Sequence, residues 1–285
     1  MLSEIKNTIS NLNSMAFMDE LPKDSFDLII CDGPYGVTSH DWDNVENIQQ
    51  YNLNLLKKFS SILKIGGAVY LFGKSNAIDF IDYRPHFELQ SRIIWYQPSR
   101  LAQGRKSYTN NYDTIFYFSK GKPKTFNLED IRVPQLVELE HRKRCENVPS
   151  VKNGQYGKTV FNENGKNPGD VWGDIKQLTY KSKELVSREL LNTIQKPEKL
   201  IERIIKASSN KGEFIFDPFV GSGTVPVVCE QLERFYVGCE INPQYVEIAN
   251  QRLEEARRKM ALDEFLPLFS DKVENSKNAV QGSFL

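Results

Sequence analysis

The stretch FDLIICDGPYG (26–36) joins a mainly apolar run to an acid, two glycines, a proline and a tyrosine. A short apolar run of this kind predicts a strand that is buried on both faces. Residues 32–36 have the composition of a turn, because glycine adopts unusual dihedral angles and proline fixes φ. Turn chemistry by itself explains this sequence, so the rest of the chain must decide whether Asp32 also has a chemical role.

Length and composition limit the class of protein. The chain has 285 residues, enough for one large α/β domain or for a domain with an inserted module. It is 40% hydrophobic and 26% charged, which is typical of a soluble globular protein. No apolar run approaches the roughly 18 residues that a membrane span needs, and the first residues lack the layout of a signal peptide. We therefore expect a cytoplasmic protein.

The cysteines and histidines predict neither disulfides nor a metal site. Cys31, Cys145, Cys229 and Cys239 form no C-x-x-C pair, and three of them lie in or beside apolar runs. We interpret them as reduced core residues. With only three histidines besides, no plausible zinc ligand set is present, and we expect no metal.

Apolar runs and amphipathic segments alternate along the chain. We expect strands at 26–31, 67–73, 92–96, 112–118, 213–216 and 234–239, and helices at 45–63, 198–208, 223–233 and 243–260. Gly66 and Gly67 are expected to end the first of these helices. Alternating strands and helices predict an α/β protein with a doubly wound, mostly parallel sheet. Residues 120–190 break this rhythm and predict a loop-rich insertion, and the last 20 or so residues resemble a polar tail.

A second strand end, FDPFVGSGT (216–224), leads through a glycine-rich turn into a helix. Gly221 and Gly223 let the backbone approach a ligand closely, and free N–H groups at a helix start attract a carboxylate or phosphate. Ser222 or Thr224 is expected to cap the helix. The pattern is neither G-x-G-x-x-G nor a P-loop, so it favours neither a dinucleotide nor a triphosphate.

The strand that follows this helix, RFYVGC (234–239), ends at Glu240. A carboxylate in that position suits a ribose diol, because it accepts hydrogen bonds from both hydroxyls. Ligands of open α/β sheets bind at the carboxyl ends of the strands, which is where Glu240, the 216–224 turn and Asp32 are all expected. A tight turn beside a helix start is the structural alternative.

Charge alone assigns no partner. The formal net charge is zero, although a local basic face is enough to bind nucleic acid. Residues 120–185 contain 13 Lys and Arg against 9 Asp and Glu, including the run HRKR (141–144). Such a run is more often a solvated surface than a binding site.

Together these motifs resemble those of S-adenosylmethionine-dependent DNA amino-methyltransferases. DGPYG resembles the D-P-P-Y catalytic motif of that family, and FDPFVGSGT resembles its F-x-G-x-G cofactor motif. The catalytic motif comes first, which is the order of the beta group, whose members are common as modification enzymes of restriction systems. Further similar segments are IIWYQPS, TNNYDTIFYFSKGKP, GKNPGDVW and IQKPEKLIERIIKAS, so that the resemblance covers roughly residues 5–260.

The resemblance implies a circularly permuted, Rossmann-like sheet of the class I methyltransferase type, with an insertion that recognises the target. The expected divisions are a catalytic half (1–122), a target-recognition insertion (123–190), a cofactor-binding half (191–261) and a C-terminal tail (262–285). The expected cofactor is S-adenosylmethionine. The residues expected to bind it are Asp217, Pro218, Phe219, Gly221, Ser222, Gly223, Thr224, Glu240 and Lys196.

The resemblance places catalysis on Asp32, Gly33, Pro34 and Tyr35. An exocyclic amine is a poor nucleophile because its lone pair is delocalised into the ring. The Asp32 carboxylate and the Gly33 carbonyl can each accept one amino hydrogen and so direct the lone pair at the methyl group. Tyr35 can stack on a base flipped out of the duplex, while Pro34 stiffens the loop.

Duplex DNA is the partner that the resemblance implies. The residues expected to contact it are Arg100, Arg105, Lys106, His141, Arg142, Lys143 and Arg144. Trp172 is expected to anchor the insertion. A cognate restriction endonuclease acting on the same site is a further expected partner, and we expect a monomer or a homodimer.

This sequence departs from the family pattern in three places. Gly33 replaces the first proline of D-P-P-Y, which keeps the main-chain carbonyl but predicts a less rigid loop. Leu12 and Asn13 stand where the family has Gly-Asp, so the contact usual there is not expected. Asn192 lies near the place of a histidine that often precedes T-Q-K-P.

The resulting prediction is a site-specific DNA methyltransferase that acts on N6 of adenine, because relatives with Asp at the first loop position mostly do so. The chemistry of Asp32 admits cytosine N4 equally, since both bases carry an exocyclic amine. A protein or RNA methyltransferase is a further alternative, although related enzymes that modify glutamine have an N-P-P-Y loop after the cofactor motif. A catalytically inactive DNA-binding relative is the last alternative, and Gly33 is its only indication.

Overall fold

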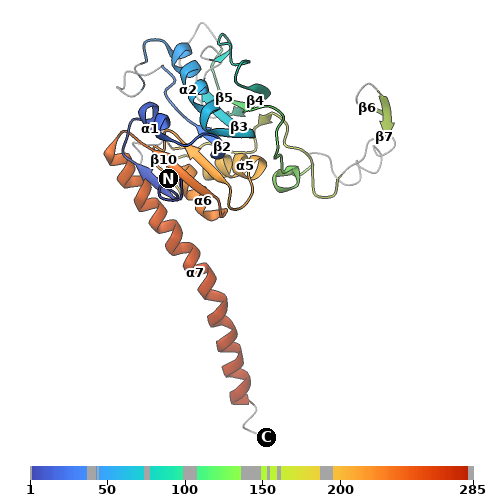
Figure 1. The fold of residues 1–285 in the computed structure, drawn as a ribbon. Helices are drawn as coiled ribbons and strands as arrows, with labels where there is room; N and C mark the ends of the chain where they lie inside the picture. The colour runs from blue at the N-terminus through green and yellow to red at the C-terminus, as the bar shows by residue number, and fades with distance from the viewer. Residues whose placement is uncertain are drawn as a thin grey trace.

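The computed structural model describes residues 2–36, 43, 45–73, 78–98, 108–135, 149–152, 155–158, 162–186 and 195–281. For 149–152, 155–158 and 264–281 it describes the backbone only. An eight-stranded sheet forms the centre of the molecule, and a separate two-stranded hairpin lies away from it (Figure 1).

The strand order of the central sheet is β1-β10-β9-β2-β3-β5-β4-β8. The strands are β1 Thr8–Ser10, β2 Phe26–Cys31, β3 Leu63–Gly73, β4 Glu88–Tyr96, β5 Tyr112–Ser119, β8 Val171–Trp172, β9 Phe214–Asp217 and β10 Phe235–Cys239. Within this sheet of the described residues, β5 alone runs antiparallel to its neighbours. The hairpin pairs β6 Pro149–Lys152 with β7 Gln155–Lys158. The predicted doubly wound, mostly parallel α/β sheet is confirmed.

Helices cover both faces of the sheet. They are α1 Ser14–Glu20, α2 Ile48–Ile62, α5 Glu198–Ser208, α6 Thr224–Gln231 and α7 Pro243–Gln281, with a 3₁₀ turn at Leu128–Ile131. Successive side chains of a strand point to opposite faces, so Ile29 and Cys31 pack with α1 and α2. Leu28 and Ile30 pack with α5, α6 and the start of α7. This explains why β2 is apolar almost throughout.

The structure corrects the predicted end of α2 and adds short elements that the sequence analysis does not predict, among them β1 and α1. Gly66 and Gly67 do not end α2, which stops at Ile62, but lie inside β3. Gly66 has φ of 82° there, and the pairing of β2 with β3 shifts register at this point, which is the geometry of a β-bulge. The short elements β1 and α1 carry too few residues to show a periodicity, and sequence analysis missed them.

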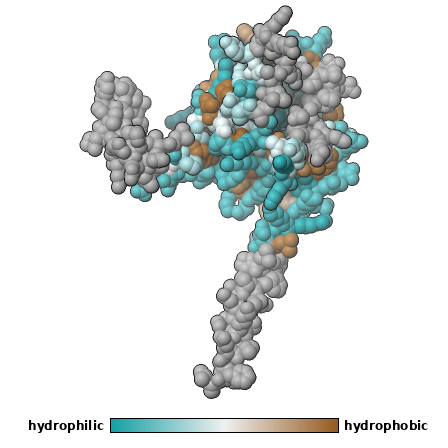
Figure 2. Space-filling model, turned by 180° about the vertical axis from the view of Figure 1, so that it is seen from behind, coloured by the Kyte–Doolittle hydropathy of each residue, from teal (hydrophilic) through white to brown (hydrophobic). Residues whose placement is uncertain are grey.

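The last helix extends away from the body of the molecule (Figure 1). The expected helix over 243–260 continues to Gln281, through the segment expected to be a tail. Residues 243–281 contain no glycine, but Pro267 lies inside the helix, so helix propensity does not explain its continuity there. Among the described residues, no helix is both long and apolar enough to cross a membrane. On the face shown in Figure 2, most of the coloured residues are hydrophilic, and the hydrophobic ones lie in small patches.

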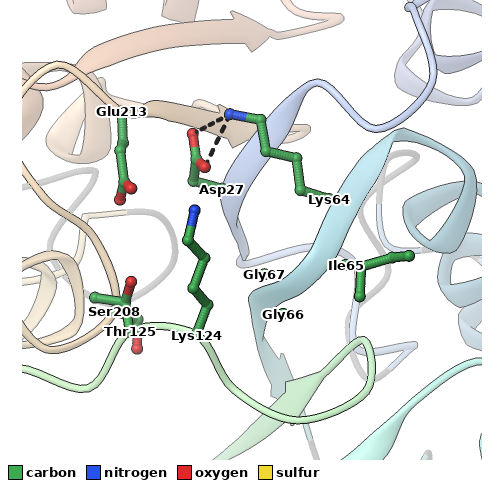
Figure 3. Close-up of a pocket in the computed structure, with 9 residues that line it drawn as sticks. All are labelled: Asp27, Lys64, Ile65, Gly66, Gly67, Lys124, Thr125, Ser208 and Glu213. Atoms are coloured by element: carbon green, nitrogen blue, oxygen red, sulfur yellow. Dashed lines mark hydrogen bonds and ion pairs between the residues drawn. The ribbon is translucent and has the colours of Figure 1, made fainter.

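The amino-terminal edge of the sheet is held together by Asp27 near the start of β2. Its carboxylate accepts hydrogen bonds from Lys64 Nζ at 2.8 and 2.7 Å and from the Phe214 N–H at 3.0 Å, which ties β2 to the starts of β3 and β9. A small pocket beside this ion pair is lined by Lys124 and Glu213 among others (Figure 3). It lies at the edge opposite to Asp32, so it is separate from the site described below.

Candidate active site

The two motifs singled out in the sequence end adjacent strands. β2 pairs in parallel with β9, with Leu28 opposite Ile215 and Ile29 opposite Phe216. Asp32 follows the last residue of β2, and Asp217 is the last residue of β9. The chain continues from β2 to β3 on one side and from β9 to β10 on the other, so the two ends meet where the winding of the sheet reverses. Such a switch point is the usual ligand site of an open α/β sheet.

Both oxygens of the Asp32 carboxylate have a partner. The Tyr35 hydroxyl donates to Oδ1 at 2.5 Å, and Lys196 Nζ forms an ion pair with Oδ2. Lys196 is 164 residues away from Asp32 in the sequence, and the side chains of both are mostly buried. Burial raises the pKa of Tyr35 well above its usual value, and the charge of Asp32 adds to this shift. Tyr35 is therefore a neutral donor toward the carboxylate.

The Lys196 ammonium also lies near two aromatic rings. It lies 5.8 Å from the centre of the Tyr35 ring and 5.5 Å from that of Phe72, within range of cation–π attraction. Its backbone carbonyl accepts a hydrogen bond from the Thr224 hydroxyl at 3.2 Å. Lys196 thus contacts both the loop after β2 and the glycine-rich turn.

Glu240 closes the glycine-rich turn. Its Oε2 accepts the Gly221 N–H at 2.9 Å, and its Oε1 accepts the Asn242 N–H at 2.8 Å. The helix α6 begins from Gly223 at φ of 86°, and a Cβ on this residue would lie 2.8 Å from Ala249 of α7. Only glycine fits this conformation and this close approach without strain.

The predicted capping of α6 by Ser222 or Thr224 is wrong, because the cap residue is Gly223 and no side chain makes a capping bond. The Thr224 hydroxyl instead bonds to Lys196, and Arg252 of α7 donates to the Ser222 carbonyl at 2.8 Å. Arg252 also pairs with Glu198 at 3.0 Å, so this buried guanidinium holds the turn to α5 and α7. Nothing in the sequence singles out this arginine.

Asp217 lies beneath the turn and is buried. Its Oδ1 accepts the Phe219 N–H at 3.0 Å. Burial raises the pKa of Asp217 well above its usual value, and the nearby charges of Asp32 and Glu240 raise it further. The Phe219 ring occupies the space beside Gly33, where a Cβ would lie only 2.9 Å from it. The glycine-rich turn and the loop after β2 are therefore in direct contact.

Other predicted residues are only partly covered by the structure. Asn13, which stands where the family has an acid, caps α1 by accepting the Met15 and Ala16 N–H groups. Trp172 is buried and its Nε1 donates to the Gly169 carbonyl. Residues that lie outside the described part of the chain are Arg100, Arg105, Lys106, His141, Arg142, Lys143, Arg144 and Asn192. Cys31, Cys229 and Cys239 are buried and free, and Cys145 also lies outside the described part.

The geometry defines a class of protein. A carboxylate loop and a glycine-rich turn meet at the switch point of a doubly wound sheet with one antiparallel strand, the arrangement of a class I methyltransferase. Solved structures that share this fold include two proteins of low sequence identity to this chain. The complex of M1.HpyAVI with S-adenosylmethionine superposes with a TM-score of 0.57 and 20% sequence identity, covering 86% of this chain and 98% of the other. The PvuII cytosine-N4-specific DNA methyltransferase superposes with a TM-score of 0.59 and 18% sequence identity, covering 86% of this chain and 87% of the other.

A family model described as DNA methylase, of the N6/N4 type, matches residues 26–251, and the chain belongs to this family. It is 30% identical to the type II methyltransferase M1.MboII of Moraxella bovis over 250 residues, 86% of this chain and 95% of the relative. It is 32% identical to the DNA adenine methyltransferase YhdJ of Escherichia coli K12 over 263 residues, 87% of this chain and 83% of the relative. The resemblance noted in the sequence is confirmed.

The position of Glu240 predicts its effect on cofactor affinity. Replacing Glu240 by Ala removes the acceptor proposed for the ribose hydroxyls, so calorimetry in chelator should show S-adenosylmethionine binding about 10- to 100-fold more weakly. Glu247→Ala, an exposed change on α7, is the control and should bind normally.

Because Glu240 also bonds to the turn itself, a second ligand separates the two roles. An analogue of the cofactor without ribose hydroxyls should bind the wild type and Glu240→Ala alike. An equal loss of affinity for both ligands would mean that Glu240 acts only through the turn.

Proposed function

We propose that this protein transfers a methyl group from S-adenosylmethionine to N6 of adenine at one short sequence of duplex DNA, after flipping the base. The proposal rests mainly on the position of the Asp32 carboxylate. Asp32 directly follows β2, beside the glycine-rich turn that follows the neighbouring strand β9. Asp32 serves as the acceptor for the amine, and the Gly33 carbonyl as the second acceptor. Tyr35 stacks on the base and Pro34 limits the motion of the loop.

The charges at this edge of the sheet fit the cofactor. The carboxyl groups of Asp32 and Glu240 lie on either side of the turn, and carboxylates favour a cationic ligand over a phosphate. Glu240 at the end of β10 suits a ribose, and the turn from Asp217 to Thr224 lies between it and Asp32. When bound, S-adenosylmethionine supplies a methyl group on a positively charged sulfur.

Asp32 and Tyr35 must rearrange for catalysis. The Tyr35 hydroxyl occupies Oδ1 of Asp32, so a turn of the ring toward the base frees this oxygen for an amino hydrogen. The nitrogen lone pair then forms the new N–C bond as the C–S bond breaks and its electron pair stays on sulfur. Asp32 is the acceptor for the proton that the nitrogen loses.

Lys196 completes the proposed site from the other half of the chain. Its ammonium holds Oδ2 of Asp32, which fixes the direction of Oδ1. Its backbone carbonyl accepts the Thr224 hydroxyl, which keeps the residue beside the turn, whereas the sequence predicts that Lys196 binds the cofactor itself. We propose that Lys196 orients the catalytic carboxylate and contributes less to cofactor affinity.

Adenine is favoured over cytosine by the aspartate at position 32 and by the similarity to YhdJ, which is a DNA adenine methyltransferase. The similarity to type II methyltransferases such as M1.MboII supports a role as the modification enzyme of a restriction system, with a cognate endonuclease as a separate partner.

Two Asp32 variants and the product test the proposed reaction. Asp32→Ala removes one acceptor and should lower the methylation rate about 100-fold or more, while cofactor affinity changes little because the 217–224 turn remains. Asp32→Asn keeps an acceptor oxygen and should lose less of the methylation rate.

Nucleoside analysis of DNA methylated by the wild type should give N6-methyladenine. N4-methylcytosine as the sole product would contradict the adenine assignment, and an active Asp32→Ala would contradict the mechanism.

The two contacts of Lys196 predict different effects on rate and on binding. Lys196→Met keeps the backbone contact to Thr224 but removes the ion pair, so single-turnover methylation should slow at least about tenfold with a small change in cofactor affinity. Lys196→Arg keeps a cation and should recover part of the rate. Severe loss of cofactor affinity in Lys196→Met with a normal single-turnover rate would instead place the side chain on the cofactor.

Described lysines at the same edge of the sheet extend the proposed DNA contact beyond 141–144. β8 runs parallel to β4, so residues 173–186 leave the sheet on the side of Asp32. The acids of this segment are engaged, Asp174 with Arg203 and Glu184 with the Glu198 N–H. The exposed lysines of the segment are Lys176, Lys181 and Lys183.

Phosphate contacts predict a change in salt dependence. Replacing these three lysines by Gln should weaken binding to all DNA sequences alike and flatten the slope of log K against log salt by up to about 0.9 per contact. Neutralising Arg142, Lys143 and Arg144 should act in the same way. A matched control replaces Lys23, Lys122 and Lys124, which are exposed at the opposite edge. Equal effects of the first set and this control would mean that residues 173–186 do not face the DNA.

A further inference from the structure

Asp43 is a buried acid that makes direct bonds to the catalytic loop. Its side chain is almost fully enclosed, with 1% of the residue exposed. One oxygen, Oδ1, accepts the Tyr35 N–H at 2.6 Å and the Gly36 N–H at 2.8 Å. These donors belong to the loop that carries Asp32, and both are part-buried. A buried N–H without an acceptor is costly, so these bonds favour one conformation of the loop.

Apart from Pro34, the loop has little covalent stiffness. Gly33 brings no side chain, and Gly36 has φ of 66°, a conformation that glycine adopts without strain. A proline at position 33 would restrict the backbone, whereas here the ring of Phe219 fills the space beside it. Hydrogen bonds to a carboxylate are stronger than those between neutral groups, which suits Asp43 to hold such a loop.

Asp43 is not the cap of the helix that follows. The cap of α2 is Asn47, whose Oδ1 accepts the Gln50 N–H at 3.0 Å. The start of α2 therefore has its own side-chain acceptor, and the two described side-chain bonds of Asp43 are directed to the loop.

We propose that Asp43 is a positioning residue, which holds the backbone of residues 35–36 so that Tyr35 and the Gly33 carbonyl face the target amine. It supplies through hydrogen bonds the rigidity that a proline at position 33 would supply covalently. The inference rests on the proposed function in that the loop is catalytic, but the hydrogen bonds themselves can be tested without any acceptor substrate.

Two substitutions separate the hydrogen bonds from the charge. Asp43→Ala removes the acceptor, so the single-turnover methylation rate should fall about 10- to 100-fold, since small misplacements of a reacting group have effects of this size. The dissociation constant of S-adenosylmethionine should change less than about threefold, because Glu240 and the Lys196 carbonyl still hold the turn at 217–224. Asp43→Asn retains an oxygen at the Oδ1 position and should recover most of the rate.

Asn47→Ala is the matched control for loss of local stability. It removes a side-chain bond to the backbone only four residues further along but leaves the loop bonds intact, so it should lower the melting temperature without a comparable loss of rate. Rates are compared at equal fractions of folded protein. A rate loss in Asp43→Ala no greater than in Asn47→Ala, or no recovery in Asp43→Asn, would overturn the proposal.

Amide hydrogen exchange tests the bonds independently of methylation. The Tyr35 and Gly36 amides should exchange at least about tenfold faster in Asp43→Ala than in the wild type, and near the wild-type rate in Asp43→Asn. Unchanged exchange would overturn the role of Asp43 whatever the protein methylates. If the two amides exchange faster in Asp43→Ala but the wild-type protein methylates no DNA, only the proposed function is contradicted.

Discussion

The parallel pairing of β2 with β9 is the contact on which the site depends. It joins segments far apart in the sequence and places the ends of two strands side by side at the point where the winding of the sheet reverses. Asp32 and Asp217 lie at these ends, so both motifs face the same space. The apolar residues of β2 pack against helices on both faces, and the Asp27 ion pair holds the opposite edge.

Electrostatics gives this edge its chemical character. Three carboxylates gather there, those of Asp32, Asp217 and Glu240, and burial together with their mutual repulsion raises the pKa of Asp217. One cation, Lys196, pairs with Asp32 directly. In the proposed function, this site suits a positively charged methyl donor, and the ion pair from the second half of the chain orients the Asp32 carboxylate.

The loop at residues 32–36 is held by its surroundings more than by its own sequence. Gly33 removes a covalent restraint, yet the loop is bonded to Asp43 and its Gly33 lies against Phe219 of the cofactor turn. A substitution that looks unfavourable in the motif is therefore compatible with an ordered loop, because hydrogen bonds and packing from outside the motif restrain the same atoms.

The sequence by itself determined the strands and helices that have a clear period, the order of the two motifs and the residues at the strand ends, because side-chain patterning and turn chemistry are local. Glu240 was identified in this way, since an acid directly after an apolar run is visible in the chain. The tertiary structure decided that Gly66 lies in a bulge and that Lys196 pairs with Asp32. It also decided that Asp43 bonds to the loop, because such contacts depend on which distant segments the folded sheet and its helices bring together.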